Sequence, residues 1–481
     1  MTTEFSVGDR IVSGDAVHVL DQAQAAALNA GGRIVALTDQ LSIIDHDIVS
    51  RVAEGVGRAV TAFDDMANVS DDSISHFFER FAVRLEDDGV FAQVLEANAA
   101  DVESARSRNR SIGRLEITPK MRNDMIDGAR MWSRSSVSKE LVTERVEHEG
   151  WSVEKVASPL GVVAFVFEGR PNVCVDATGV LRTGNTCVFR IGSDALRTAN
   201  ALMVNCLTPS LIEAGLPSDA VVLLDESDRA AGLALFSDRR LGLAVARGSG
   251  RAVQDLGLVA QSSGIATSLH GTGGAWMILG DSVDSGWFAE TVVNSLDRKV
   301  CNTVNVCCVP HGRVAEVVGV LAQQVADLGR RSNVRCTIHT VGLDQREIDT
   351  LAGEFIEVVE STVGELGTEW EWDVSPEFFV VATSSVDEAF DLCNRYSPNF
   401  VVSMLSNDPE DHQKAWRMLN APFVGNGFTR WVDGQYALGR PELGLSNWQH
   451  GRALARGGIL SGDDIRTYRY RMVQHDPHVR R

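Results

Sequence analysis

The sequence predicts an α/β protein built on two parallel sheets, and three features of its pattern predict this. From residue 160 onward, continuous apolar runs of strand length alternate with helical segments, which is typical of a parallel sheet covered on both faces. A second series of the same kind begins near residue 270. The first 140 residues instead carry apolar residues at three- and four-residue spacing, which favours helices.

Length and charge limit what the protein can do. A chain of 481 residues exceeds one ordinary core, so two or three sub-domains are expected. Its 44% hydrophobic and 23% charged residues are typical of a soluble globular protein. The formal net charge of −20 repels nucleic-acid phosphates and anionic membranes, so we expect neither as a partner. No apolar run reaches bilayer length and the N-terminus has no signal-peptide pattern, which predicts a cytoplasmic protein.

The N-terminal part is predicted to be mainly helical. The apolar-periodic segments are 21–41, 51–66, 91–110 and 117–132. A Thr-Pro pair near the start of the last segment is a helix start signal. The stretch "ELVTERVEHEGWSVEKVASP" then alternates polar and apolar side chains on both sides of "HEG", which predicts a β-hairpin over residues 141–157.

The first α/β block begins with the apolar run "GVVAFVFEG". Further strands are predicted at 185–192 and 220–225, with helices at 173–184 and 194–215 between them. Parallel sheets bind ligands at the carboxyl ends of their strands. We therefore expect cofactor contacts in the loops that follow Phe167, Phe189 and Val245.

The second block repeats this alternation. Its predicted strands include 274–280, 305–310, 378–383 and 400–406, and its helices include 316–329, 385–397 and 412–420. A loop-rich tail follows, and the chain finishes on "IRTYRYRMVQ", which favours an edge strand or one that pairs with a partner.

Three of the eight cysteines crowd into "VNSLDRKVCNTVNVCCVP". So few cysteines in so long a chain do not make a disulfide scaffold, and the spacing does not match a zinc site. Cys307 and Cys308 lie inside an apolar strand, where adjacent side chains point to opposite faces. Cys301 instead follows Arg298 and Lys299, and nearby cations lower a thiol's pKa and favour the nucleophilic thiolate. The residues alone leave open whether Cys301 is catalytic or a partly buried structural thiol. The other five lie singly and are expected to be buried: Cys174, Cys187, Cys206, Cys336 and Cys393.

Five ordered motifs carry a resemblance to a known family. "SPLGVVAFVFEGRPNVCVDATGVLRTGNTCVFRIGSDA" is similar to the signature region of γ-glutamyl phosphate reductases, also called glutamate-5-semialdehyde dehydrogenases, a branch of the aldehyde dehydrogenase superfamily. "EANAADVESARS", "VVNSLDRKVCN", "NGFTRWVDGQYALGRPELGLS" and "ARGGILSGDDIRTYRY" resemble the same family. The resemblance covers residues 80–472, and residues 1–60 are longer than the family usually carries.

The resemblance implies an aldehyde dehydrogenase-like fold with two Rossmann-like domains. Residues 1–140 would be the helical part of the cofactor domain and 141–157 an oligomerisation hairpin. Residues 158–268 would form the dinucleotide-binding domain and 269–440 the catalytic domain, with 441–481 returning to the cofactor and oligomerisation region. Such an enzyme would be a homodimer or homotetramer of proline biosynthesis, supplied by an upstream kinase.

The resemblance also implies a reaction, in which NADPH reduces an acyl phosphate to a semialdehyde, reversibly. Cys301 would be the nucleophile and would carry the acyl group as a thioester. Ordinary aldehyde dehydrogenases use a glutamate to activate water, whereas "SLHGTGGAWMILGD" has no carboxylate before Asp281. Phosphate, not water, is then the natural partner of the thioester. His270, close to that position, would move a proton or else be a loop histidine bonded to backbone.

Further site residues follow from the same resemblance. Asn302 would offer a donor to the oxyanion. The expected cofactor contacts are Arg190, Ser193, Arg247, Gly248, Ser249, Gly250 and Glu442. Arg190, the cation that follows the strand "TCVF", suits the 2′-phosphate of NADP, and the alternative is a solvated arginine at the end of a strand. The segment "ARGSG" is either a phosphate-binding loop or a plain strand-to-helix turn. The expected substrate contacts are Glu168, Arg170, Asn172, Arg430 and Asp433.

The chain departs from the family near the nucleophile. Asn305 stands where the family has a glutamate, and "DRK" replaces Gln-Arg-Pro in a shorter segment. These changes leave two alternatives open. One is a paralogue acting on a different acyl phosphate, acyl thioester or aldehyde, and the other is a catalytically silent nucleotide-binding homologue.

Overall fold

The computed structural model describes residues 4–13, 16–37, 40–110, 112–167, 169–248, 250–432, 437–449, 452–453 and 458–480. The chain divides into two compact units. Unit 1 comprises Met1–Gly271, Leu438–Leu445 and Ile459–Arg481, and unit 2 comprises Thr272–Ala437 and Ser446–Gly458. None of the described helices is both long and apolar enough to cross a membrane.

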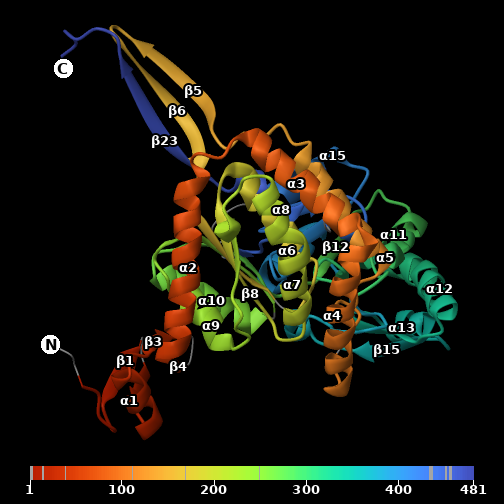
Figure 1. The fold of residues 1–481 in the computed structure, drawn as a ribbon. Helices are drawn as coiled ribbons and strands as arrows, with labels where there is room; N and C mark the ends of the chain where they lie inside the picture. Colours follow the sequence, from red (N-terminus) through yellow and green to blue (C-terminus); the bar gives the residue numbers. More distant parts are fainter. Residues whose placement is uncertain are drawn as a thin grey trace. The chain divides into compact units, whose positions relative to one another are not determined.

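Unit 1 is built around a five-stranded parallel sheet (Figure 1). Its strands, in the order β11-β10-β7-β8-β9, are β7 (Val162–Phe167), β8 (Thr186–Ile191), β9 (Val221–Leu223), β10 (Leu241–Arg247) and β11 (Ala266–His270). The predicted strands of the first block are thereby confirmed. The register aligns Phe167 with both Ile191 and Arg247, and Arg247 with His270. These four residues therefore mark one continuous carboxyl edge of the sheet.

The helices of unit 1 confirm most of the predicted ones. They are α2 (His46–Met66), α3 (Asp71–Glu86), α4 (Asp88–Ser107), α5 (Pro119–Ser133), α6 (Val173–Ala177), α7 (Leu196–Leu202), α8 (Thr208–Glu213), α9 (Arg229–Phe236) and α10 (Gly250–Ser262). Thr118 caps α5 by accepting from the backbone N–H of Met121, and Pro119 is its first residue, as the Thr-Pro signal predicts. Phe77, Phe81 and Phe91 of α3 and α4 are fully buried in one core with Phe165 of the sheet.

The first 45 residues differ from the prediction of a helix over 21–41. Helix α1 (Gln22–Asn29) stops early, and strands β3 (Arg33–Ala36) and β4 (Leu41–Ile44) follow as an antiparallel pair. A second pair, β1 (Arg10–Ser13) and β2 (Ala16–Val19), precedes them. Gly31 has a φ of +94°, and a Cβ on Gly32 would lie 2.7 Å from the Ala27 carbonyl oxygen. The glycine pair therefore ends the helix and turns the chain into a strand.

The predicted hairpin is confirmed as β5 (Leu141–His148) and β6 (Trp151–Pro159), which turn at Gly150 with a φ of +81°. The last strand, β23 (Arg466–Gln474), pairs antiparallel with β6 and makes a three-stranded ribbon in the order β23-β6-β5 (Figure 1). The prediction of an edge strand at 465–474 is also confirmed. A short antiparallel pair, β19 (Glu442–Leu445) and β22 (Ile459–Ser461), completes the described strands of unit 1.

Unit 2 holds a seven-stranded parallel sheet in the order β15-β14-β16-β13-β12-β17-β18. These strands are β12 (Ala275–Leu279), β13 (Val304–Pro310), β14 (Cys336–Val341), β15 (Ile356–Glu360), β16 (Glu377–Thr383), β17 (Val401–Leu405) and β18 (Phe423–Gly425). The helices are α11 (Ser285–Asn294), α12 (Val314–Ser332), α13 (Gln345–Leu351), α14 (Val386–Tyr396) and α15 (Pro409–Met418). Strands β20 (Trp448–Gln449) and β21 (Arg452–Ala453) pair separately.

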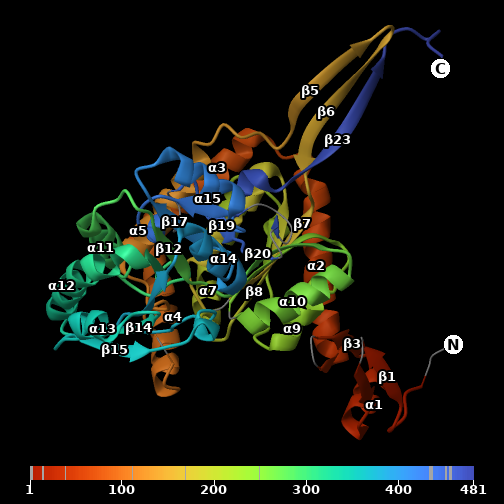
Figure 2. The same ribbon diagram turned by 180° about the vertical axis from the view of Figure 1, so that it is seen from behind.

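The two faces of the sheet in unit 2 carry separate cores (Figure 2). One core contains residues of α11, α12 and α13, and the other contains residues of α14 and α15. Cys307 belongs to the first core and Cys308 to the second, so the two side chains leave β13 on opposite faces, as predicted.

Candidate active site

Cys301 stands apart from the other cysteines. It lies between α11 and β13 and is partly exposed, and it forms no disulfide. The other six cysteines whose side chains the structure describes are buried. Burial raises the pKa of Cys206 and Cys393 to about 12, and that of Cys336 to about 11, while those of Cys307 and Cys308 also rise. Among these seven, Cys301 is the thiol that solvent reaches.

Two glycines hold the backbone of Cys301. The Gly274 N–H donates to the Cys301 carbonyl oxygen at 2.7 Å, and Gly274 has a φ of +100°. A Cβ on Gly273 would lie 2.5 Å from that oxygen and 2.6 Å from the Cys301 Cα. The loop before β12 therefore passes directly against the main chain of the thiol, at a distance that only glycine permits.

Asn302 and Arg430 brace the same turn from another side. Asn302 is fully buried, and its Nδ2 donates to the Val432 carbonyl oxygen. Its Oδ1 accepts from Nε of Arg430 at 3.0 Å. Arg430 also donates to the carboxylate of Asp297, four residues before the thiol. One N–H of the Asn302 amide is thus used within the protein, and the backbone N–H groups of Cys301 and Asn302 are further candidate oxyanion donors.

A buried ion pair lies on the third side of Cys301. Nζ of Lys299 lies 2.6 Å from Oε1 of Glu369, and their side chains are only 6% and 16% exposed. Oε2 of Glu369 accepts from the Gly273 N–H at 2.7 Å. Asn305 fixes the segment that carries this glutamate, because its Nδ2 donates to the Thr368 carbonyl oxygen at 2.9 Å and its Oδ1 accepts from the backbone N–H of residue 370 at 3.1 Å. Glu369 therefore connects the nucleophile loop to the glycine loop.

Sequence reasoning missed Gly273, Gly274 and Glu369. The "GTGG" run before a predicted strand is a signal for the glycines, since paired glycines mark a close backbone approach. Glu369 carries no local signal, because it lies 68 residues after Cys301 and meets it only through the sheet topology. Among the described residues, no group of three or more His, Cys, Asp or Glu side chains is arranged to hold a metal ion.

In unit 1, three predicted residues lie at or just after the carboxyl edge of the sheet: Arg170, Arg247 and His270. His270 ends β11 and is buried, and the register places it beside Arg247 at the end of β10. Burial, together with the charges of Arg247 and Arg170, lowers the pKa of His270 to about 3. The imidazole is therefore neutral near pH 7 and acts as a hydrogen-bonding group more readily than as a base.

A cavity of about 630 Å³ opens at this edge of unit 1. We call it the α9–α10 pocket, because the starts of α9 and α10 line it together with the ends of β7, β8 and β10. Its charged side chains are Arg190, Arg229, Arg247, Arg251, Asp228 and Asp255. Within a chain of net charge −20, this excess of cations favours a phosphate-bearing ligand.

Arg190 gives the α9–α10 pocket its specific anchor for an anion. The residue is 8% exposed, and one of its Nη atoms donates to the Ser227 carbonyl oxygen. Its buried Nε has no hydrogen-bond partner among the described residues. Burial lowers the pKa of Arg190, and the charge of Asp228 opposes this. A buried guanidinium with an unused donor fits the 2′-phosphate or pyrophosphate of a dinucleotide.

The remaining predicted site residues lie as follows. Gly248 lines the α9–α10 pocket, and Gly250 begins α10. Ser193 is exposed, and Asn172 bonds Asp176 at 3.3 Å. Glu442 is buried at the start of β19. Glu168, Ser249 and Asp433 lie outside the described residues.

Comparisons with known proteins show which proteins this chain is similar to. γ-Glutamyl phosphate reductase of Kosmotoga olearia is 29% identical over 81% of this chain and 90% of that protein. The protein of the same name from Nitrobacter winogradskyi is 29% identical over 81% of this chain and 88% of its own length. The crystal structure of γ-glutamyl phosphate reductase from Thermotoga maritima has a TM-score of 0.76 at 24% identity, and the match covers 90% of this chain and 100% of that one.

The predicted fold class and the predicted resemblance are thereby confirmed. The model of the aldehyde dehydrogenase family matches residues 50–340 of the sequence. Because that match spans more than half of the 481 residues, the chain belongs to the aldehyde dehydrogenase family.

Proposed function

We propose that this enzyme reduces γ-glutamyl phosphate to its semialdehyde with NADPH, reversibly, in the cytoplasm. The observation that carries the proposal is the setting of Cys301, a partly exposed thiol fixed on its backbone by Gly274 and flanked by Lys299. The relatives named γ-glutamyl phosphate reductase, which align over four-fifths of the chain, support this substrate.

The first chemical step belongs to Cys301. Its thiolate attacks the acyl carbon, the C–O bond to phosphate breaks, and inorganic phosphate leaves with the electron pair of that bond. The negative charge that develops on the acyl oxygen needs donors, and the backbone N–H groups of Cys301 and Asn302 are the proposed ones. The contacts that Gly273, Gly274 and Arg430 make with Cys301 and Asn302 hold this loop in place as the charge forms.

A bound NADPH would supply the hydride that reduces the resulting thioester. The residues proposed to hold it are Arg190, Arg247, Gly248, Gly250 and Glu442. The unused Nε of buried Arg190 supports NADP over NAD, because a 2′-phosphate would use that donor. After reduction, the C–S bond breaks, the aldehyde leaves and the Cys301 thiol is restored by one proton.

The surroundings of Cys301 favour phosphate over water as the acceptor in the reverse direction. Glu369 is the carboxylate that contacts the loop, yet Lys299 holds one of its oxygens and the Gly273 N–H the other. A carboxylate bound in this way is a poor general base. The supply of an acyl phosphate requires a kinase that phosphorylates a carboxylate, so we propose such an enzyme as the upstream partner.

The experiment that tests this function measures NADPH formation from NADP, phosphate and glutamate semialdehyde. Cys301→Ala should abolish turnover while NADP binding persists. Omission of phosphate should stop the reaction, because Glu369, the described carboxylate at the Cys301 loop, is held by Lys299 and the Gly273 N–H. Equal rates without phosphate, or turnover by Cys301→Ala, would refute the proposal.

We propose the ribbon β5–β6–β23 as the contact of a homodimer or homotetramer. Apolar side chains on its outer strands are exposed, among them Leu141, Val142, Tyr468 and Tyr470. Exposed strand edges and apolar rows of this kind pair with other chains. Light scattering of the protein and of Tyr470→Lys should report a smaller assembly for the variant.

A further inference from the structure

The N-terminal hairpin reaches the α9–α10 pocket. Leu37, Gln40 and Ser42 line that cavity together with the two helices. These residues follow β3 or belong to β4, and the Leu37 N–H donates to the Gln40 carbonyl oxygen at 2.9 Å. They also precede residue 50, where the match to the family begins. Described residues of the N-terminal hairpin therefore line the same cavity as α9 and α10.

The hairpin is fixed in place from both of its strands. Val35 and Ile44 are buried, at 6% and 0% exposure. β4 contacts α9 and lies near it in Figure 1. A wall that is packed in this way contributes to binding without the entropy cost of ordering a loop.

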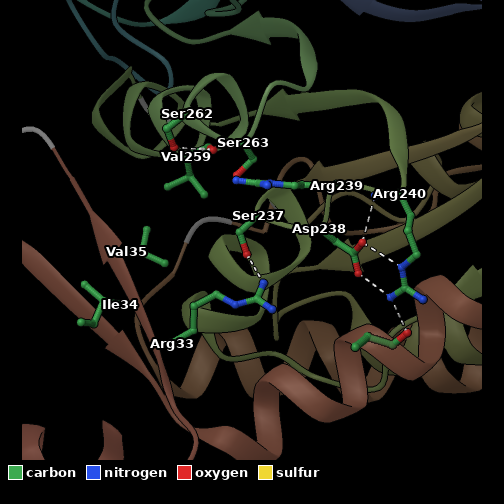
Figure 3. Close-up of a pocket in the computed structure, with 11 residues that line it drawn as sticks. Arg33, Ile34, Val35, Ser237, Asp238, Arg239, Arg240, Val259, Ser262 and Ser263 are labelled. Carbon is green, nitrogen blue, oxygen red and sulfur yellow. Dashed lines mark hydrogen bonds and ion pairs between the residues drawn. The ribbon is translucent and has the colours of Figure 1, made fainter. Parts of the chain in front are cut away.

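The far end of β3 is anchored by a hydrogen bond. One Nη of Arg33 donates to Oγ of Ser237 at 2.6 Å, just after the end of α9 (Figure 3). This bond lies in a second cavity of about 520 Å³, which Ile34 and Val35 also line. Ser237 follows the carboxyl end of α9, whereas Arg229 in the α9–α10 pocket begins that helix. The hairpin thus shares a cavity with the first residues of α9 and bonds to Ser237, just after its last residue.

The chemistry of the hairpin residues suits the uncharged part of a dinucleotide. Gln40 carries an amide and Ser42 a hydroxyl, and both donate and accept without charge. Leu37 adds an apolar surface beside Val253 and Leu256 of α10. The arginines of the pocket match phosphates, whereas these groups match the faces and edges of a purine and its ribose.

We propose that the β3–β4 hairpin forms one wall of the cofactor site and that Gln40 and Ser42 contact the adenosine half of NADP. This inference rests on the proposed function for the identity of the ligand. It assigns the N-terminal segment a role in cofactor affinity, and it makes Ser42 a position that sets how much negative charge the adenosine end tolerates.

The test measures dissociation constants for NADP and for 2′,5′-ADP, an adenosine fragment that lacks nicotinamide, by titration calorimetry. Ser42→Asp places a carboxylate at the adenosine end, whose ribose carries the 2′-phosphate of both ligands, and should weaken both by roughly 10-fold or more. Gln40→Ala should weaken both by a smaller, similar factor. Ser6→Asp is the matched control, because it adds the same charge to the same segment at an exposed residue, and it should bind like the unaltered protein.

The outcomes separate this inference from the proposed function. If the unaltered protein does not bind NADP, the proposed function fails. If it binds and both Ser42→Asp and Gln40→Ala bind equally well, the hairpin is not part of the site and the inference is overturned. Should Ser42→Asp fail to fold by circular dichroism, Gln40→Ala and Ser42→Ala together decide the question through the same two constants.

Discussion

Replacing Gly273 by alanine should disable the enzyme without removing any functional group. The φ of Gly273 is not positive, so alanine suits the backbone at this residue. The obstacle is space, because the added Cβ would lie 2.5 Å from the Cys301 carbonyl oxygen and 2.6 Å from its Cα. Both are backbone atoms, which cannot rotate away as a side chain does.

The size of the effect follows from those contacts. Ordinary van der Waals contact begins near 3.4 Å, so Cys301 must move by about 1 Å relative to the glycine loop. The Gly274 bond to the same carbonyl, at 2.7 Å, would lengthen with it. A displacement of about 1 Å at a reacting group costs on the order of 100-fold in rate, or about 2.7 kcal/mol of transition-state stabilisation. We expect kcat/KM to fall by that factor.

The assay compares kcat/KM for semialdehyde oxidation with the rate of Cys301 alkylation by iodoacetamide. Gly319→Ala is the matched control, because Gly319 is exposed in α12 and a Cβ there has nothing within 4 Å. This control should keep full activity and gain up to about 1 kcal/mol of helix stability. Unchanged kcat/KM in Gly273→Ala would refute the reasoning, since it would mean that the loop tolerates the shift.

Three further predictions concern the thiol, the ion pair and the histidine. In the native protein Cys301 should be the fastest thiol to alkylate, and Cys301→Ala should remove the fast phase seen by mass spectrometry. Glu369→Gln removes the nearer of the two carboxylates that pair with the buried Lys299, the other being Glu371 at 3.7 Å. It should lower kcat/KM by about 10-fold, with part of the loss recovered when Lys299→Met is added; strictly additive losses would disprove the coupling. His270 has a pKa lowered to about 3, so the unfolded chain binds its proton first, and stability should fall as pH drops from 6.5 toward 3. The melting temperature of His270→Gln should fall less over this pH range than that of the unaltered protein. An equal fall in the two proteins would contradict the burial argument.

The strands of both sheets were predictable because each is an unbroken apolar run. "VVAFVF" and "NVCCVP" are buried on both faces, so burial and local pattern agree. The strand within segment 21–41 was not predictable. The alanines of this segment favour a helix, whereas "RIVA" after the glycines is a short run with two β-branched residues. This four-residue strand pairs with β4, which in turn contacts α9, and no local pattern records either contact.

Site residues were predictable where the local sequence carries the signal, and they were not predictable where segments distant in the sequence come into contact. The polar position of Cys301 before a strand, next to two cations, set it apart from the other cysteines, and the family resemblance then made it the expected nucleophile. Arg430 was expected at the substrate, whereas the structure commits it to Asn302 and Asp297. That bracing depends on a contact 128 residues apart in the sequence, and neither end of it shows a local signal.

The two departures from the family pattern beside Cys301 both contact the same distant segment, the one that carries Glu369. Lys299 replaces a family proline, and its ammonium pairs with Glu369. Asn305 replaces a family glutamate, and its amide holds the backbone on both sides of Glu369. A glutamate at residue 305 would have brought a second carboxylate toward Glu369, which like-charge repulsion opposes. The neutral amide at 305 therefore adds no further carboxylate beside Glu369, and the cation at 299 pairs with Glu369 and, at 3.7 Å, with Glu371. We infer that these substitutions preserve the placement of the nucleophile by a different set of contacts, which argues for a working enzyme and against a silent homologue.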